Sequence, residues 1–268
     1  MHPRRLSVLC CLFLFSFVAQ AAEISWVPKG RRFPLTFGDP KEIRMAMLFD
    51  GSARIRAAVG NYFNLMGIDV SSESAKAAQL FMGIEGSGTF SLRQGPSGTF
   101  PLETMDGLFG LYFEMDQGPM QYQLRLTPIS AHLGDGLPGV PVKYSRESII
   151  GRVGYSPILG LHLYAGVNNL FHTQPVLPVW GAQVGSTYFL PWHLGRLTPF
   201  TAFDLQWRDE AETAKWSLNY HLGIALNDPA APYHSFRFFY NYFSGADPRG
   251  QFLNRPFTAH SLGIEMQI

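Results

Sequence analysis

The chain ends on the run Phe257-Thr258-Ala259-His260-Ser261-Leu262-Gly263-Ile264-Glu265-Met266-Gln267-Ile268. In the second half of this run every even-numbered residue is apolar, and the residues between them are glycine or polar. Successive side chains of a β-strand point to opposite faces, so the run predicts a strand with one apolar and one polar face. A chain that ends on such a strand, behind an export signal, is typical of an outer-membrane β-barrel.

The N-terminus has the pattern of a secretory signal peptide. Arg4 and Arg5 form a short basic region, and the apolar run from residue 6 to residue 18 is too short to span a membrane stably. Ala19-Gln20-Ala21 has the small-residue pattern of a cleavage site. We therefore expect residues 1–21 to be removed during export.

Composition narrows the class of protein. Charged residues make up 15% of the chain and aromatic residues 14%, whereas about a quarter of a soluble protein is charged. The mean hydropathy of +0.01 is too low for a helical membrane protein, but it fits a barrel in which polar lumenal residues alternate with apolar ones. Both cysteines, Cys10 and Cys11, lie in the predicted signal, so no disulfide, thiol nucleophile or cysteine metal site is expected. Loss of the two signal arginines changes the formal charge from +1 to about −1, which argues against a nucleic-acid partner.

Four stretches show the period-2 alternation of a half-buried strand most clearly, namely 120–126, 161–167, 216–226 and 236–242. The predicted strands that contain them are about 10 to 13 residues long, which matches a tilted membrane-spanning strand. Extending the search predicts an antiparallel barrel of 12 strands, with 10 or 14 as alternatives. The predicted strands are 43–50, 53–64, 79–93, 106–115, 119–128, 146–156, 159–168, 180–190, 197–207, 214–226, 234–244 and 257–268.

The predicted connections alternate between short and long, as periplasmic turns and outer loops do in such barrels. Counting back from the C-terminus puts the loops 129–145 and 245–256 outside. The exception is 61–80, which becomes a long periplasmic connection with 71–78 as a candidate short helix. The expected organisation is a signal peptide (1–21), a periplasmic N-terminal segment (22–42) and a barrel (43–268). A soluble β-sandwich is the competing fold, but its outward faces would carry more lysine and glutamate.

One loop region combines the residue types of a serine hydrolase. Ser130 and His132 are two positions apart, so on a strand they share a face. A serine nucleophile needs a base within hydrogen-bond reach and an acid that orients the base. Continuing the even-numbered apolar face of the preceding strand puts both residues on the lipid side. The pattern predicts a lipid-active hydrolase, of the phospholipase or lipid A deacylase type, with Ser130 as nucleophile, His132 as base, and Asp135 or Glu147 as orienting acid.

The alternative interpretation of this region is structural. Pro128 removes a ladder donor and often marks a bulge, which would reverse the parity. Ser130 and Asp135 would then bond to loop backbone, while Gly134 and Gly136 turn the chain. Other polar residues are predicted at the rim or in the lumen, where they pair across the barrel or tune ion selectivity. These are Arg125, Arg146, Glu147, Arg152, Asp204, Lys215 and Glu265. No histidine spacing fits a metal site and no glycine-rich phosphate loop is present, so neither a metal nor a cofactor is expected.

Five segments of the predicted mature chain match a known pattern: Phe37–Lys41, Ile129–Asp135, Tyr144–Ser148, Leu163–Gly166 and Gly245–Gln251. In these segments the chain resembles the exported bacterial family known as domain of unknown function 1207. The family pattern around the central segment runs approximately H-x-S-S-H-L-G-D-E, and Ser130, His132 and Asp135 match it. The departures are Pro128 at or beside the first His, Ala131 for the second Ser and Gly136 for the Glu. The resemblance implies an outer-membrane or envelope protein and specifies no activity.

The leading hypothesis is a non-enzymatic outer-membrane barrel that serves as a narrow channel, a transporter of a small solute or lipid, or an envelope component. The lipid hydrolase is the second hypothesis, and a receptor or adhesin built on the loops 129–145 and 245–256 is the third. The expected partners are outer-membrane lipids and, during biogenesis, the barrel assembly machinery. The sequence does not predict the oligomeric state. Ile268 stands where assembly signals usually end on an aromatic residue, but it keeps the apolar alternation.

Overall fold

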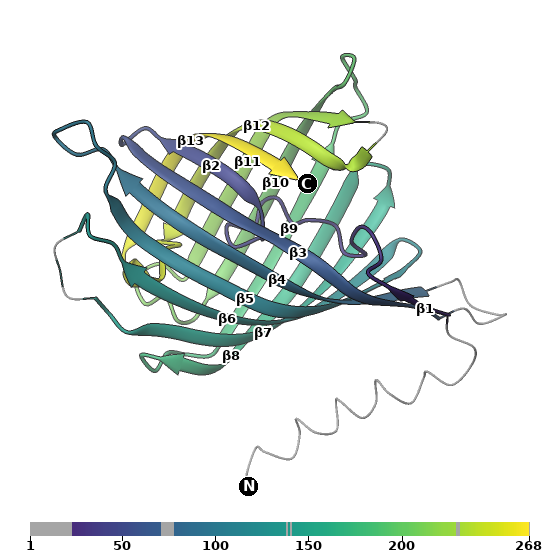
Figure 1. Ribbon diagram of the computed structural model, residues 1–268, viewed down its shortest axis with the longest axis horizontal. Coiled ribbons are helices and arrows are strands. Elements are labelled where there is room, and N and C mark those ends of the chain that lie inside the picture. Colours follow the sequence, from purple (N-terminus) through teal and green to yellow (C-terminus); the bar gives the residue numbers. More distant parts are fainter. Residues whose placement is uncertain (1–22, 71–77, 138, 140, 229–230, 268) are drawn as a thin grey trace, which may run out of the picture.

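The protein is described by a computed structural model over residues 23–70, 78–137, 139, 141–228 and 231–267. These residues form a closed, antiparallel, 12-stranded β-barrel with one additional short strand (Figure 1). Among the described residues, none belongs to a helix long and apolar enough to cross a membrane. The predicted barrel and its strand number are confirmed.

The wall follows chain order from β2 to β13, and β13 closes the ring by pairing with β2. The short strand β1 (Glu23–Trp26) adds to the last part of β3, beyond the reach of β2. The wall strands are β2 (Met45–Asp50), β3 (Arg54–Val70), β4 (Ala78–Arg93), β5 (Leu102–Gln117), β6 (Met120–Leu133), β7 (Tyr144–Ile158), β8 (Leu161–Gln174), β9 (Trp180–Phe189), β10 (Leu197–Arg208), β11 (Trp216–Asp228), β12 (Ala231–Ala246) and β13 (Pro256–Gln267).

Several strands are longer than expected, which moves predicted loop residues into the wall. β3 continues to Val70, and β4 begins at Ala78. The candidate helix at 71–78 therefore falls on residues 71–77, outside the described residues, apart from Ala78. β6 continues through Pro128 without a bulge, because the pairs Leu108–Ile129 and Leu111–Leu126 on either side of it keep one register. Proline removes a donor here and leaves the parity of the strand unchanged.

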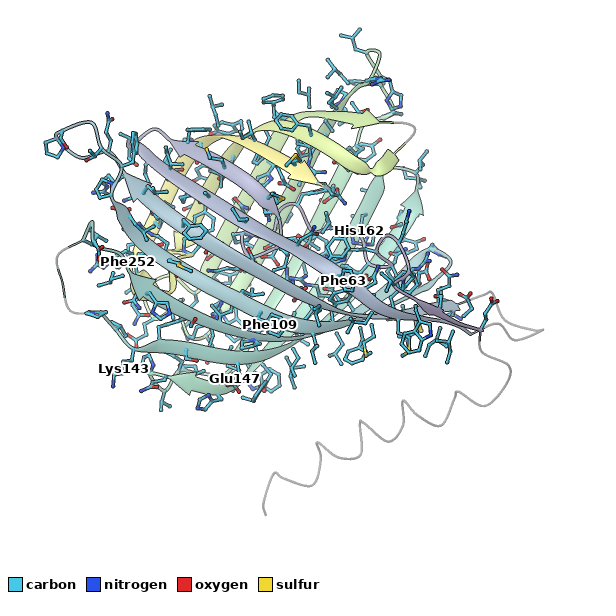
Figure 2. The ribbon with its side chains drawn as sticks, viewed as in Figure 1. Phe63, Phe109, Lys143, Glu147, His162 and Phe252 are labelled. Atoms are coloured by element: carbon cyan, nitrogen blue, oxygen red, sulfur yellow. The ribbon has the colours of Figure 1, made fainter. Side chains whose placement is uncertain are left out.

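The two faces of the wall differ as a membrane barrel requires. Along β6 the lumenal side chains of Gln121, Gln123 and Arg125 are buried, whereas Leu124 and Leu126 are 40% and 41% exposed on the outward face. Phe63 and Phe109 are exposed on the same outward face of the wall (Figure 2). A soluble protein buries apolar residues and exposes charge, so this inverted distribution is the one expected where lipid surrounds the protein.

The segment between β1 and β2 lies inside the barrel, and we call residues 27–44 the plug. It crosses the interior in dark purple in Figure 1. It enters and leaves at the rim that carries the C-terminus, because β1 pairs with the end of β3 and Met45 pairs with Met266 of β13. The segment expected to lie in the periplasm is therefore largely lumenal. Both aromatic and charged side chains of the plug are buried inside the barrel. Phe33 is 0% exposed and Asp39 is 2% exposed.

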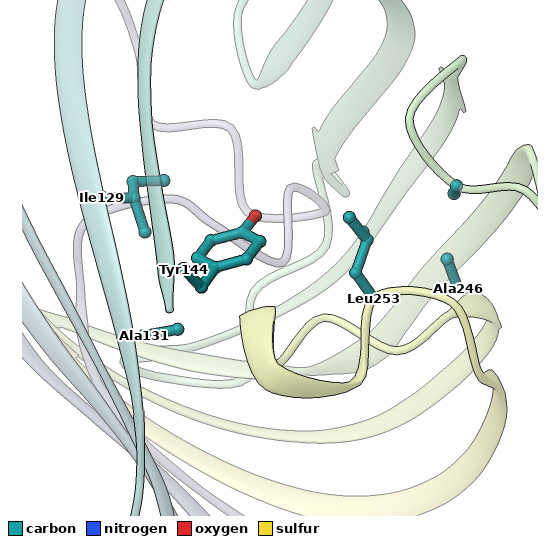
Figure 3. Close-up of a cluster of buried hydrophobic side chains, with 6 residues drawn as sticks. Ile129, Ala131, Tyr144, Ala246 and Leu253 are labelled. Carbon is teal, nitrogen blue, oxygen red and sulfur yellow. The ribbon is translucent and has the colours of Figure 1, made fainter. Parts of the chain in front are cut away.

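The opposite rim is covered by loops that fold inward, and we call this cover the cap. Ala211 of the β10–β11 loop and Leu253 of the β12–β13 loop are buried against Ile129, Ala131 and Tyr144 of the wall (Figure 3). The 3₁₀ turn η2 (Gly250–Phe252) contacts β6, and the backbone N–H of Gly250 donates to Asp106 Oδ2 at 3.0 Å. The loop 245–256, expected on the outer side, thus partly fills the mouth of the barrel.

Candidate functional site

The predicted hydrolase residues lie on the outward face, near the capped rim. Ser130 is half-buried and His132 is exposed, on the same face as Leu124 and Leu126. No hydrogen bond or ion pair joins the side chains of Ser130, His132 and Asp135, which all belong to the described residues. The structure therefore brings Ser130 and His132 to one face but does not bond one to the other.

Neither predicted acid is placed to orient His132. Asp135 is exposed in the β6–β7 loop. Glu147, on the outward face of β7, pairs in register with Pro128 (Figure 2). Pro128 and His132 are four positions apart on β6, a distance of about 13 Å along the strand. Glu147 is therefore too far from His132 to orient it. Glu147 instead lies near His172 of β8, with Oε1 and Nδ1 3.6 Å apart.

Gly134 and Gly136 have a structural role. A Cβ on Gly134 would lie 2.3 Å from the carbonyl oxygen of Leu102, and one on Gly136 would lie 2.7 Å from it. The backbone N–H of Gly136 donates to that same oxygen at 2.8 Å. Only glycine allows so close an approach of the loop to β5. This part of the motif fits the structural interpretation.

The lumen holds a denser set of polar contacts, and the plug is at its centre. Near the C-terminal rim, Arg31 forms an ion pair with Glu114 of β5, and its Nε donates to Glu114 Oε1 at 2.8 Å. The other oxygen of Glu114 accepts the backbone N–H groups of Arg32 and Phe33 at 2.9 and 3.1 Å. Charge-assisted hydrogen bonds of this kind are stronger than neutral ones. One buried carboxylate thus binds both the side chain and the backbone of the plug.

Deeper in the barrel, two acidic residues of the plug meet arginines of the wall. Asp39 forms an ion pair with Arg152 of β7 and accepts from Gln206 Nε2 at 3.1 Å. Glu42 lies within 3.6 Å of Arg152 and 3.8 Å of both Arg125 and Arg31. Their side chains are at most 5% exposed. This carboxylate is therefore shared by Arg125 and Arg152 of the wall and Arg31 of the plug, each of which also has a nearer acidic partner.

The remaining plug contacts reach the other side of the barrel. Asn219 of β11 donates through Nδ2 to the carbonyl oxygen of Gly38 at 2.7 Å. A Cβ on Gly38 would lie 2.6 Å from the backbone of Phe203, so the plug lies directly against β10. Lys41 reaches furthest toward the cap, and its Nζ is 3.0 Å from Asp106 Oδ2 on β5. The plug is fastened to strands on all sides of the wall.

Other predicted rim and lumen residues are placed as follows. Arg125, Arg146 and Arg152 are lumenal and at most 7% exposed. Asp204 accepts from the Tyr164 hydroxyl at 2.6 Å, and Glu265 pairs with Arg237 at 2.7 Å. Lys215 is not lumenal. It lies between β10 and β11, half-exposed, with its Nζ 2.5 Å from Asp209 Oδ1.

The acids that organise the lumen were not predicted as site residues from the sequence. They are Asp39, Glu42, Glu85 and Glu114. Glu85 and Glu114 had a usable signal, because each stands on the polar parity of its predicted strand. Asp39 lies in the quoted Phe37–Lys41 segment, but nothing local shows that this segment enters the barrel. No cluster of three or more potential metal-binding side chains occurs among the described residues.

Two cavities flank the plug, on opposite sides of Lys41. One is bounded by β2–β4 and β11–β12, with about 700 Å³ not filled by protein atoms, including its open part. The other is bounded by β6–β10, with about 630 Å³ measured in the same way. Charged and polar side chains alternate with apolar ones in the walls of both cavities. The lumen is therefore narrowed by the plug and not fully filled by it.

Comparison with known proteins gives a family and a fold. No curated protein matches the chain. The outer membrane phospholipase (OMPLA) of Salmonella typhi, solved as a dimer with bound calcium, has a TM-score of 0.51 at 9% identity, over 90% of this chain and 94% of that one. An active-site mutant of outer membrane phospholipase A from Escherichia coli has a TM-score of 0.52 with the same identity and coverage. At this identity the likeness shows an outer-membrane barrel fold alone. The model of the family described as "Protein of unknown function (DUF1207)" matches residues 34–267, and the chain therefore belongs to that family.

Proposed function

We propose that the protein is a non-enzymatic outer-membrane envelope component whose barrel is closed at rest by its own N-terminal segment. A small solute would cross it only after the plug moves. The observation that carries this proposal is the fastening of the plug to the wall, above all through Asp39 and Glu42, which meet Arg125 of β6 and Arg152 of β7. Buried ion pairs leave uncompensated charge when one partner withdraws, so the docked state resists opening.

Planar-bilayer recording tests the closure. The wild-type protein, refolded and checked by heat-dependent gel mobility, is expected to show no steady conductance. A variant that lacks residues 23–44 but folds by the same criterion is expected to conduct, because the plug contacts are gone. Steady wild-type conductance, or a folded deletion variant that stays closed, would contradict the proposal.

The proposal includes export and insertion. We place the protein in the outer membrane with residues 1–21 cleaved and with insertion by the barrel assembly machinery through the C-terminal strand. The outward apolar face and the outer-membrane fold of its structural neighbours support this placement. N-terminal sequencing of the mature protein should begin at Ala22, and a chain truncated after Arg255 should fail to reach the outer membrane. Normal insertion of the truncated chain would refute the role of β13.

Lipid hydrolysis is the second candidate, favoured by one observation: Ser130 and His132 share the outward face, where lipid would be accessible. The test is fatty-acid release from phospholipid and from lipopolysaccharide by the refolded wild type and by Ser130→Ala. Release by the wild type alone would establish Ser130 as the nucleophile and contradict the non-enzymatic role. Release by neither protein is the outcome that the missing orienting acid predicts.

A further inference from the structure

The cavity beside β6–β10 differs from the other lumenal cavity in its unpartnered polar atoms. Four buried side-chain atoms without a hydrogen-bond partner belong to residues that line it: Thr127 Oγ1, Arg146 Nε, Asn168 Oδ1 and Arg208 Nε. The cavity beside β2–β4 has one such atom, His221 Nδ1. Buried polar groups without partners are unfavourable, so a concentration of them indicates a polar occupant.

Arg208 decides what kind of occupant fits. It is 8% exposed at the end of β10 and forms no ion pair among the described residues. Its recorded side-chain partners are neutral, the carbonyl oxygen of Ala246 at 3.2 Å and Ser217 Oγ at 3.5 Å. Glu210 supplies the main negative charge near Arg208, but its carboxylate forms its ion pair with Arg146 at 3.1 Å. A buried guanidinium that shares its counter-charge in this way is unfavourable unless a further anion neutralises it.

The other cations of this wall are already compensated. Arg125 pairs with Glu85 at 2.8 Å, Arg146 with Glu210 at 3.1 Å, and Lys41 with Asp106 at 3.0 Å. Arg152 pairs with Asp39. Arg146 and Arg208 therefore share the one carboxylate of Glu210, so an occupant meets two guanidinium groups for one negative charge at this end of the cavity. This balance selects a small anion and disfavours a cation or a large polyanion.

The lining of the cavity places two guanidinium groups on its border. Gly166 and Gly181 also line it, and the wall is closely packed there, because a Cβ on Gly181 would lie 3.2 Å from the carbonyl oxygen of Trp207. Arg146 and Arg208 each have an unpartnered Nε and line the same cavity. Guanidinium groups bind tetrahedral oxyanions through parallel hydrogen bonds.

We propose that the cavity between plug, cap and β6–β10 is a binding site for a small oxyanion of the phosphate class, with Arg208 as its charge anchor. Arg146 Nε and the Thr127 hydroxyl donate to the anion, and Asn168 donates through its amide Nδ2. The site depends on the folded barrel but not on closure of the lumen. A conducting wild type would therefore refute the proposed closure and leave this site standing.

To test this, the wild-type protein is refolded in phosphate or in chloride of equal ionic strength. Phosphate can then enter the cavity during refolding and does not have to pass through a closed barrel. Binding of inorganic phosphate is then measured by equilibrium dialysis, and unfolding by heat-dependent gel mobility. We expect saturable phosphate binding and a higher unfolding temperature in phosphate. Parallel dialysis with glycerol 3-phosphate, and with glycerol as neutral control, shows whether the site takes a free or an esterified phosphate group.

Arg208→Gln removes the anchor and should weaken phosphate binding about 10- to 100-fold, the loss typical of a charged hydrogen bond. Arg93→Gln is the matched control, because Arg93 is half-exposed, pairs with Glu103 at 3.1 Å, and does not line the cavity. Thr127→Val, nearly identical in shape, serves if Arg208→Gln does not fold and should weaken binding several-fold. Absence of saturable binding by the wild type, or equal binding by the wild type and the folded cavity variant, would overturn the proposal.

Discussion

The plug and the outward Ser130–His132 region differ in how well their sequence predicts their side-chain contacts. The outward region has the residue types of a catalytic site, yet Ser130 and His132 make no side-chain bond to each other and no acid orients the histidine. The plug has no motif of known chemistry, yet Asp39 and Glu42 each meet buried arginines. Catalytic residue types that are close in sequence indicate a site only where the fold also brings their side chains within hydrogen-bond distance of one another.

The largest expected difference between the two regions is in the response to loss of one carboxylate. Glu42→Gln leaves Arg31, Arg125 and Arg152 without their shared counter-charge and should lower the free energy of unfolding by about 3–5 kcal/mol. Asp135→Asn, the same change in the exposed outward loop, should stay within about 0.5 kcal/mol. Urea unfolding in detergent, followed by gel mobility, measures both. Equal stabilities would show that the plug is not fastened as described.

A second difference concerns depth along the outward face. Leu126→Arg puts a charge where the strand faces lipid and should cost about 2–4 kcal/mol if this position lies near the bilayer midplane. His132→Arg, six residues further toward the capped rim, should cost no more than about 1 kcal/mol. Folding equilibria in lipid vesicles compare the two variants. A larger loss of stability for His132→Arg than for Leu126→Arg would show that His132 lies deeper in the membrane than Leu126, contrary to this prediction.

The wall itself allows a smaller test of the two faces. Tyr164 covers lumenal Gly185 so closely that a Cβ there would lie 2.3 Å from its ring, whereas a Cβ on Gly151 meets nothing within 4 Å. Gly185→Ala should therefore destabilise the barrel by about 1–3 kcal/mol through overpacking. Gly151→Ala should be neutral within about 0.5 kcal/mol. Thermal unfolding of the pair decides whether the lumenal side chains are as tightly packed as the structure shows.

The smallest effect is expected from Ser130→Ala. The hydroxyl has no partner among the described residues, so its removal should change the free energy of unfolding by less than about 0.5 kcal/mol. The same urea unfolding measures it, with Thr127→Val on the lumenal face of β6 as comparison. A loss above 1 kcal/mol would reveal a structural bond of Ser130 that the structure does not contain.

The wall could be predicted from sequence because alternation is local. Each of the four clearest runs needs only its own residues to show two faces, and the parity of β6 is unaffected by Pro128 because the register is kept on both sides. The plug could not be predicted in this way. Its partners lie far along the chain, with Glu114 83 residues from Arg31, Arg152 113 residues from Asp39, and Asn219 181 residues from Gly38. Such pairings follow from closure of the barrel and leave no local periodicity.

The most direct test of the lumenal plug is zero-length carbodiimide cross-linking of the folded wild-type protein, read by mass spectrometry. Lys41 Nζ is 3.0 Å from Asp106 Oδ2, so an amide should join the peptides that contain these two residues. Lys215 and Asp209, 2.5 Å apart in an exposed loop, provide the internal control for reagent activity. We predict both links in the folded protein and, after heat unfolding, only the local Lys215–Asp209 link. A Lys215–Asp209 link without any link from Lys41 to the barrel wall would contradict the docked plug.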